Sequence, residues 1–211
     1  MPEIILASAS PRRAALLRQI GLPFRVYPSA LDENGACLRR SRRGRQAGPG
    51  PDGENPEARA CRLARAKAED VAARLGRGLI IGADTIVVCE GIGLGKPRHS
   101  QEAREFLRRL AGRTHQVITG VAVTEAETGR AEVAAATTLV RMRAFDPVEA
   151  AAYVATGEPL DKAGAYAIQG RGALLVEGIE GDYSTIVGLP LPTLAMLLRR
   201  FSLDLWEAAR T

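Results

Sequence analysis

Apolar residues change from one spacing to another along the first 30 positions, and these changes predict secondary structure. Residues 3 to 8 form a short apolar run typical of a buried strand. After Ser10, a good helix cap, and Pro11, apolar positions recur at helical spacing as far as Gly21. Residues 22–29 return as a second expected strand. The chain is therefore predicted to begin strand, helix, strand.

The next patterned segments predict one long helix and one central strand. The helix is expected to start at a capping Asn55 with Pro56 in its first position, and to end at Gly76. Residues 78–91 are apolar and β-branched on both sides of a single acid, which favours a central strand. We expect this strand to be interrupted between residues 82 and 85.

The second half of the chain mixes helices and strands without strict alternation. Ser100 is expected to cap its helix. The remaining predicted elements are a helix at 99–112, a hairpin at 114–143, a helix at 146–159, a glycine-rich stretch at 164–188 and a helix from about Pro190. This pattern favours an α/β or α+β fold with a mixed sheet and two lobes around a cleft.

Residues 31–55 combine glycine, proline and arginine without hydrophobic periodicity, which predicts a mobile loop. Within it we expect a flexible basic insertion at 36–53, including the arginine-rich residues 39–45. The simpler interpretation of this basic segment is a solvated loop, and the alternative is a contact with an anion or a nucleic acid. The chain as a whole is expected to form one domain, 1–211, with two lobes around a shared core.

Composition excludes several classes of protein. No apolar run approaches the roughly 20 residues that span a bilayer, so a cytoplasmic protein is expected. Three distant cysteines, Cys37, Cys61 and Cys89, make a zinc site or a disulfide framework improbable. The net charge of +5 suits a polyanionic partner, but 4% aromatic residues offer few surfaces for stacking nucleic-acid bases.

Asp84 is the strongest candidate for a functional residue, because a carboxylate within an apolar strand is costly to bury without partners. A structural interpretation has backbone amides at the bend satisfying it. A functional interpretation makes it a metal ligand or a general base. Both readings remain open from the strand pattern alone.

Four cations lie near expected bends or on the long helix: Arg12, Arg13, Lys67 and Lys96. Guanidinium groups bind phosphate oxygens in pairs and lysines act as point charges, so such a set suits a polyphosphate bridged by a divalent ion. Each cation alone could equally be a solvated surface charge. The spacing around Lys96 excludes a phosphate-binding P-loop, and no nucleophile elbow is present.

Gln169 lies among glycines, where the backbone can approach a ligand closely. Its amide offers both a donor and an acceptor, as reading a nucleobase edge requires. An ordinary loop with a surface glutamine is the competing interpretation.

Several of these segments, in order, resemble the Maf-like nucleoside triphosphate pyrophosphatases. The matching runs are LASASPRRAALLRQIGLPF, LDE, ARLARAKAEDVA, IGADTIVV, LGKPR, GRTHQVITGVAV and YVATGEPLDKAGAYAIQGRGALLVEGIEGDYSTIVGLPL. The resemblance implies an elongated mixed sheet like that of inosine triphosphate pyrophosphatases. It also implies hydrolysis of a nucleoside triphosphate to the monophosphate and pyrophosphate, with a divalent metal, Mg²⁺ or Mn²⁺, usually by a homodimer.

The run DKAGAYAIQG resembles the branch acting on dTTP and UTP, which implies pyrimidine substrates, including modified uridine triphosphates. Carried over by motif, Asp84 is the proton acceptor and a metal ligand, and Glu33 helps to hold the metal. Arg12, Thr85 and Gln169 match positions that set base preference. The implied substrate-binding residues are Ser8, Arg12, Arg13, Lys67, Thr85, Lys96 and Gln169.

A second hypothesis makes the chain a non-enzymatic regulator of cell division, or a nucleic-acid-binding protein, acting through the basic loop. The arginine run at 39–45 motivates it. The acids and cations already described favour the enzyme. The chain also departs from the family between residues 37 and 53, where its link is longer than usual.

Overall fold

The computed structural model describes residues 2–31 and 54–208. Glu33 and the predicted insertion at 36–53 lie outside these residues. The helices are α1 (Pro11–Gln19), α3 (Pro56–Leu75), α4 (Ser100–Leu110), α5 (Pro147–Ala155), α6 (Tyr183–Val187), α7 (Leu191–Arg199) and α8 (Leu205–Ala208). The strands are β1 (Ile4–Leu6), β2 (Arg25–Val26), β3 (Leu79–Cys89), β4 (Ile92–Leu94), β5 (Thr114–Glu125), β6 (Ala131–Met142) and β7 (Val176–Glu180).

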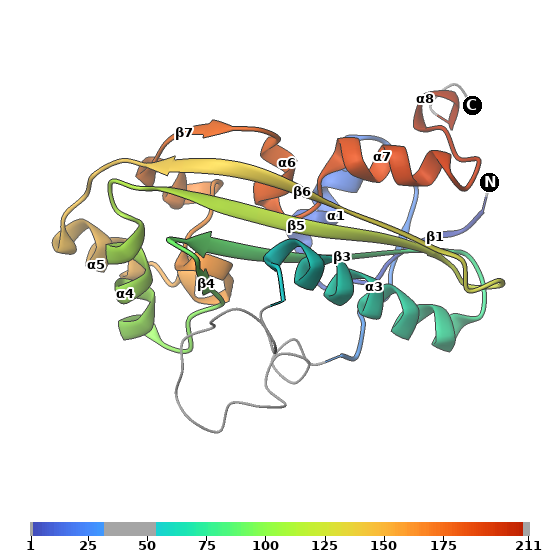
Figure 1. Cartoon of the computed structure of the whole chain (residues 1–211), viewed down its shortest axis with the longest axis horizontal. Coiled ribbons are helices and arrows are strands. Elements are labelled where there is room, and N and C mark those ends of the chain that lie inside the picture. The colour runs from blue at the N-terminus through green and yellow to red at the C-terminus, as the bar shows by residue number, and fades with distance from the viewer. Residues whose placement is uncertain (1, 32–53, 209–211) are drawn as a thin grey trace.

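One mixed sheet of seven strands organises the fold, which confirms the predicted class. Its order is β2-β1-β3-β5-β6-β7, and β4 pairs with the far end of β3. The pairs β1–β2 and β1–β3 are parallel, and the others are antiparallel. The long strands β3, β5 and β6 cross most of the molecule in Figure 1. No helix in the described ranges is long and apolar enough to cross a membrane.

Most predicted element types are confirmed, while several boundaries are wrong. Asn55 caps α3 as expected, since its Oδ1 accepts the Glu57 amide at 2.9 Å. The cap of α4 is His99, whose Nδ1 accepts the Glu102 amide, and the expected cap Ser100 is the first helical residue. β2 has two residues where eight were expected, because prolines on both sides supply no N–H for pairing.

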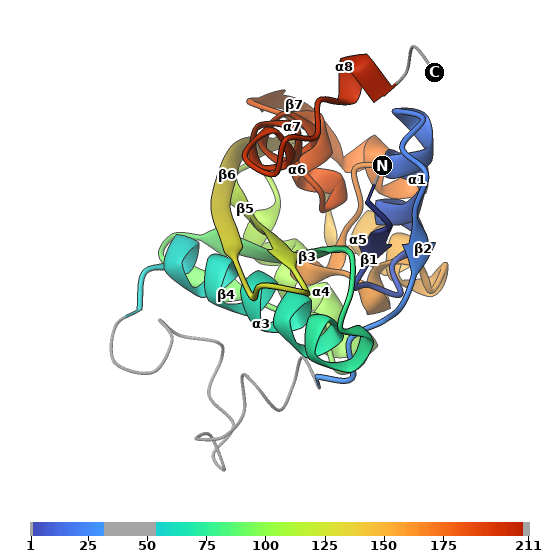
Figure 2. The ribbon, with the colours of Figure 1, turned by 90° about the vertical axis from the view of Figure 1, so that its right-hand side faces the viewer.

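Helices cover both faces of the sheet, as Figure 2 shows from the end. α3 packs across β3 and β5 on one face, while α1 and α7 contribute to an apolar cluster on the other. A separate cluster joins α4 and α5 to the second half of β3. The two largest clusters share β3 and β5, so these strands connect the two halves of the molecule.

β3 is continuous, so the predicted interruption between residues 82 and 85 is wrong. One edge of β3 pairs with β5 along nearly its whole length. The other edge pairs with β1 over Leu79–Ile81 and with β4 over Val87–Cys89. Between these segments, no strand among the described residues pairs with that edge of β3. The break therefore lies in the neighbouring strands, beside Asp84 and Thr85 at the middle of the sheet.

Gly82 is explained by close packing against α3. A Cβ atom added there would overlap the Ala64 carbonyl oxygen and lie 2.9 Å from the Ala68 amide nitrogen. Gly120 on β5 makes a similar approach to Ala60, with a built Cβ 2.6 Å from the Cys61 nitrogen. Missing side chains on the sheet thus allow α3 to lie almost directly on the backbone of β3 and β5.

Candidate functional site

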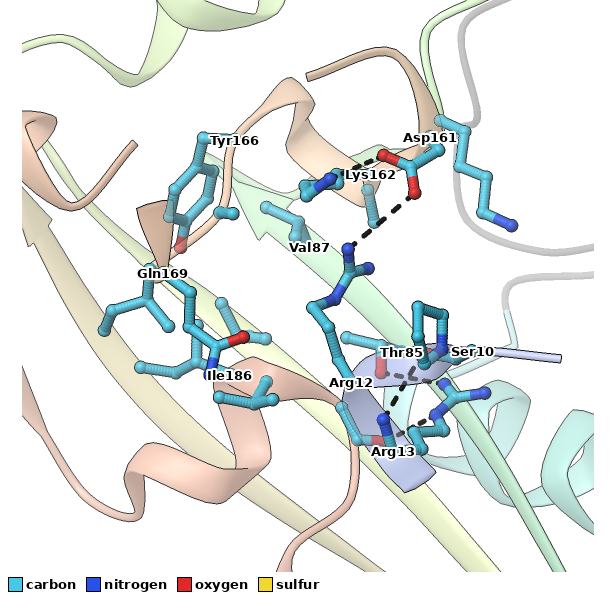
Figure 3. A pocket seen from close by; sticks show the side chains of 18 of the residues that line it. Ser10, Arg12, Arg13, Thr85, Val87, Asp161, Lys162, Tyr166, Gln169 and Ile186 are labelled. Atoms are coloured by element: carbon cyan, nitrogen blue, oxygen red, sulfur yellow. Dashed lines mark hydrogen bonds and ion pairs between the residues drawn. The ribbon is translucent and has the colours of Figure 1, made fainter. Parts of the chain in front are cut away.

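A pocket of about 310 Å³ lies at the open edge of β3. Its walls come from the loop between β1 and α1, the middle of β3, the loop after β4, and the segments 161–169 and 186–188. Figure 3 shows Arg12, Arg13 and Thr85 in this pocket, with Gln169 and Tyr166 on another wall. The pocket therefore gathers residues from almost the whole length of the chain.

Most of the predicted site residues meet in this pocket. Those that line it are Ser8, Arg12, Arg13, Asp84, Thr85, Lys96 and Gln169. Lys67 does not line the pocket but reaches Asp84 from α3. Glu33 lies outside the described residues. Their roles in binding and catalysis stay predictions.

Asp84 forms a largely buried ion pair with Lys67, whose Nζ lies 2.6 Å from Asp84 Oδ1. The exposed side-chain fractions are 7% for Lys67 and 15% for Asp84, so the pair is well shielded from water. The structural interpretation that backbone amides at a bend satisfy this carboxylate is wrong. An ammonium group offsets the carboxylate charge from the α3 side, while the carboxylate also borders the pocket.

Arg13 is buried and ties three segments together. Its Nε donates to the Gly188 carbonyl at 2.7 Å, its Nη1 to Ser8 Oγ at 3.1 Å and its Nη2 to Thr85 Oγ1 at 3.3 Å. Alternation along β3 explains the last contact, because consecutive side chains point to opposite faces. Asp84 thus meets α3, and Thr85 meets α1.

The Thr85 hydroxyl belongs to a chain of hydrogen bonds. Thr119 Oγ1 donates to the Thr185 carbonyl at 2.8 Å, so the 2.9 Å bond between the two threonine hydroxyls takes its proton from Thr85. Thr85 also accepts from Arg13. The Thr85 hydroxyl can therefore accept one hydrogen bond from a ligand but cannot donate one. If Thr85 influences base preference as predicted, it does so as an acceptor.

Arg12 points into the pocket, and its partner there is Asp161. Asp161 Oδ2 lies 3.7 Å from Arg12 Nη1, and its Oδ1 accepts from Lys162 Nζ at 2.5 Å (Figure 3). Asp161 and Lys162 were missed as individual site residues, although both stand in the quoted run DKAGAY. The pocket lining holds four cations, Arg12, Arg13, Lys96 and Lys162, and two acids. This excess of positive charge suits an anionic ligand.

Behind the pocket wall, His115 Nε2 forms a 2.7 Å hydrogen bond with the Tyr166 hydroxyl. His115 is 2% exposed, and its Nδ1 has no hydrogen-bond partner. Burial lowers the pKa of His115 from 6.5 to about 4. His115 is therefore neutral at physiological pH and holds Tyr166 in place.

Replacing His115 should flatten part of the pH dependence of stability. Between pH 6.5 and about 4 the unfolded chain binds a proton at His115 that the folded chain does not bind. This contribution is complete above pH 6.5 and is lost as pH falls toward 4, by up to about 3 kcal/mol. Urea unfolding at pH 7 and pH 4.5 should show a smaller difference for His115→Gln than for the unchanged chain. Equal differences in both proteins would contradict the assigned pKa.

Among the described residues, no group of three or more His, Cys, Asp or Glu side chains could hold a metal. Asp84 nevertheless suits a magnesium-like ion that takes further oxygen ligands from a substrate. Such ions are commonly bound by one or two carboxylates together with substrate phosphates and water. Asp84 is one of the two carboxylates that line the pocket, and the cations of the same lining could hold the substrate phosphates.

Comparisons with known proteins identify the family of this chain. The model of the Maf-like protein family matches residues 3–201. The dTTP/UTP pyrophosphatase of Moorella thermoacetica is 52% identical over 206 residues, which cover 98% of this chain and 98% of that protein. The dTTP/UTP pyrophosphatase of Geotalea uraniireducens is 48% identical over 198 residues, or 94% of each chain. The dTTP/UTP pyrophosphatase of Pelotomaculum thermopropionicum is 46% identical over 201 residues, or 95% of this chain and 97% of that one. Matches over nearly the full length show that this chain belongs to the Maf-like protein family.

Proposed function

We infer that this protein hydrolyses pyrimidine nucleoside triphosphates, dTTP and UTP and also modified uridine triphosphates, to the monophosphate and pyrophosphate. The observation that carries the proposal is Asp84, held by Lys67 at the open edge of β3 and bordering a pocket lined by four cations. Three relatives of nearly the same length are named dTTP/UTP pyrophosphatases, which supports the same substrates here.

The reaction needs water to attack the α-phosphorus while the bond to the bridging oxygen of the β-phosphate breaks. In our proposal Asp84 accepts the proton of the attacking water, and pyrophosphate leaves with the bridging oxygen. Arg13 and Lys96 lie in the pocket, where they can offset the charge of the triphosphate and of the departing pyrophosphate. Ser8, held by Arg13, belongs to the same phosphate-binding wall.

We propose that the enzyme uses a divalent metal, Mg²⁺ or Mn²⁺, held by Asp84 and by Glu33. When bound, such a metal lowers the pKa of water and neutralises phosphate charge. The homodimer and the cytoplasmic location implied by the family resemblance also stay proposals. Sedimentation and cell fractionation would test them.

A panel of nucleotides with Mg²⁺ or Mn²⁺ tests the proposed function. We expect dTTP and UTP to be converted to monophosphate and pyrophosphate, and chelation of the metal to stop turnover. The products should be separated so that pyrophosphate is distinguished from orthophosphate. Release of orthophosphate, or equal turnover of purine and pyrimidine nucleotides, would refute the proposal.

Base discrimination should depend on Arg12 and Gln169 more than on Lys67 or Lys96. Removing one well-placed hydrogen bond to a base edge should cost about ten to a hundredfold in selectivity. We therefore expect Gln169→Ala and Arg12→Ala to lower the kcat/KM of UTP relative to GTP. Lys67→Ala and Lys96→Ala should lower kcat/KM equally for both nucleotides, because Lys67 pairs with Asp84 and Lys96 is a pocket cation that every triphosphate can meet. Equal losses for both nucleotides in all four variants would contradict this assignment.

A further inference from the structure

The segment that carries Gln169 folds around one carboxylate, that of Glu158. Its Oε1 accepts the Tyr153 hydroxyl at 2.8 Å and the Gly172 amide at 3.0 Å. Its Oε2 accepts the Arg171 amide at 3.0 Å. Short 3₁₀ turns form much of this segment, Glu158–Asp161, Ala163–Ala165 and Gly170–Leu175, and such turns have little stability of their own. Hydrogen bonds to Glu158 therefore contribute much of the stability of the segment that carries Gln169.

Tyr153 extends these contacts to the other side of Gln169. Its hydroxyl donates to Glu158 and accepts from the Ala167 amide at 3.2 Å. The Tyr153 side chain is buried in the cluster formed by α4 and α5, so its hydroxyl is anchored to a rigid part of the fold. The backbone is consequently held two residues before Gln169 and two residues after it.

The surrounding chain leaves little room for another arrangement. At Gly170, where φ is +67°, an added Cβ would lie 2.8 Å from Glu158 Oε2. At Gly172 it would lie 2.6 Å from the Tyr153 hydroxyl. Both glycines are therefore required by the close wrapping of the chain around Glu158 and Tyr153.

Glu158 is ionised at neutral pH. Burial opposes its ionisation most strongly, but the Gly172 amide, the Tyr153 hydroxyl and the Arg171 amide together hold its pKa below its usual value. An ionised carboxylate can accept all three bonds, whereas an amide would place a donor against one of these donors.

We propose that Glu158, acting with Tyr153, is a positioning residue that sets where Gln169 stands in the pocket wall and thereby sets base selectivity. This inference rests on the proposed function, in which Gln169 reads the base. Glu158 acts on the substrate only through the backbone that carries Gln169. Its loss should therefore affect the choice of base more than the handling of the triphosphate.

Glu158→Gln tests the positioning role with a side chain of nearly the same size. We expect KM for UTP to rise with little change in kcat, so that the preference for UTP over GTP falls about tenfold. Tyr153→Phe keeps the buried ring and should move the preference in the same direction. Glu132→Gln is the matched control, because Glu132 pairs with Arg130 and Arg200 away from the pocket. It should leave the preference unchanged.

Binding of non-hydrolysable UTP and GTP analogues supplies a readout that needs no turnover. If the unchanged chain releases no pyrophosphate, the proposed function fails, but the analogues still decide the positioning role. Hydrogen exchange should also rise at the amides of Ala167, Arg171 and Gly172 in Glu158→Gln. The inference would be overturned if Glu158→Gln lost affinity equally for both nucleotides. It would also be overturned if hydrogen exchange rose while the preference for UTP stayed the same, or if the unchanged chain showed no preference.

Discussion

Asp84→Asn is expected to slow pyrophosphate release from UTP by about a thousandfold, within the range that a general base contributes. Asparagine keeps the size of the side chain and can accept the Lys67 hydrogen bond through its carbonyl oxygen. It cannot accept a proton from water at neutral pH. Binding of a non-hydrolysable UTP analogue should therefore change far less than kcat. Pre-steady-state measurement of bound monophosphate would show whether the chemical step itself is slowed.

Asp161→Asn is the matched control, because Asp161 is the other carboxylate that lines the pocket. The Asp161 side chain is well exposed and pairs with Lys162 and Arg12. It is not proposed to act as a general base. We expect less than a tenfold loss, in keeping with the modest energies of exposed ion pairs. Full turnover by Asp84→Asn, or similar losses in the two variants, would refute the role assigned to Asp84. Thermal unfolding of each variant would exclude a folding defect.

Gly82→Ala should lower the free energy of unfolding by about 3 kcal/mol, at the upper end of overpacking costs. The added methyl group would overlap the Ala64 carbonyl oxygen, which is part of the backbone of α3 and cannot rotate away. Relief requires α3 to move off the sheet. That movement would also draw Lys67 away from Asp84, so turnover should fall together with stability.

Gly95→Ala provides the control, since an added Cβ there meets no atom within 4 Å and the backbone needs no positive φ. Its unfolding free energy should change by less than about 1 kcal/mol. Urea denaturation of both variants measures the difference directly. If Gly82→Ala proved as stable as Gly95→Ala, the close approach of α3 to β3 would be wrong.

Much of the fold could be predicted because local signals and tertiary packing agree. Asn55, Pro56 and Gly76 define α3, and the turn at 125–130 separates β5 from β6. Gly82 misled the prediction, because a glycine that admits a helix onto a sheet looks the same in sequence as one that bends a strand. Which strand lies beside which is a long-range property that apolar spacing does not contain.

The site was predictable in its residue types more than in its contacts. Asp84 stands out in the sequence because a carboxylate in an apolar strand needs a partner, and Lys67 is that partner. The pairing itself could not be foreseen, since it depends on how α3 lies across β3. Glu158 gave no signal as a single acid in a loop, because its importance comes from the amides that the folded chain brings to it.

The hydrogen bond from the Arg13 side chain to Gly188 also has a consequence for protein synthesis. The Gly188 carbonyl that receives Arg13 Nε is made 175 residues after the arginine itself. A nascent chain lacks this acceptor until Gly188 has emerged from the ribosome. Gln169, which lies a little earlier in the sequence, also emerges late. The pocket is therefore assembled late in translation, and a growing chain lacks part of its lining while its first half is folding.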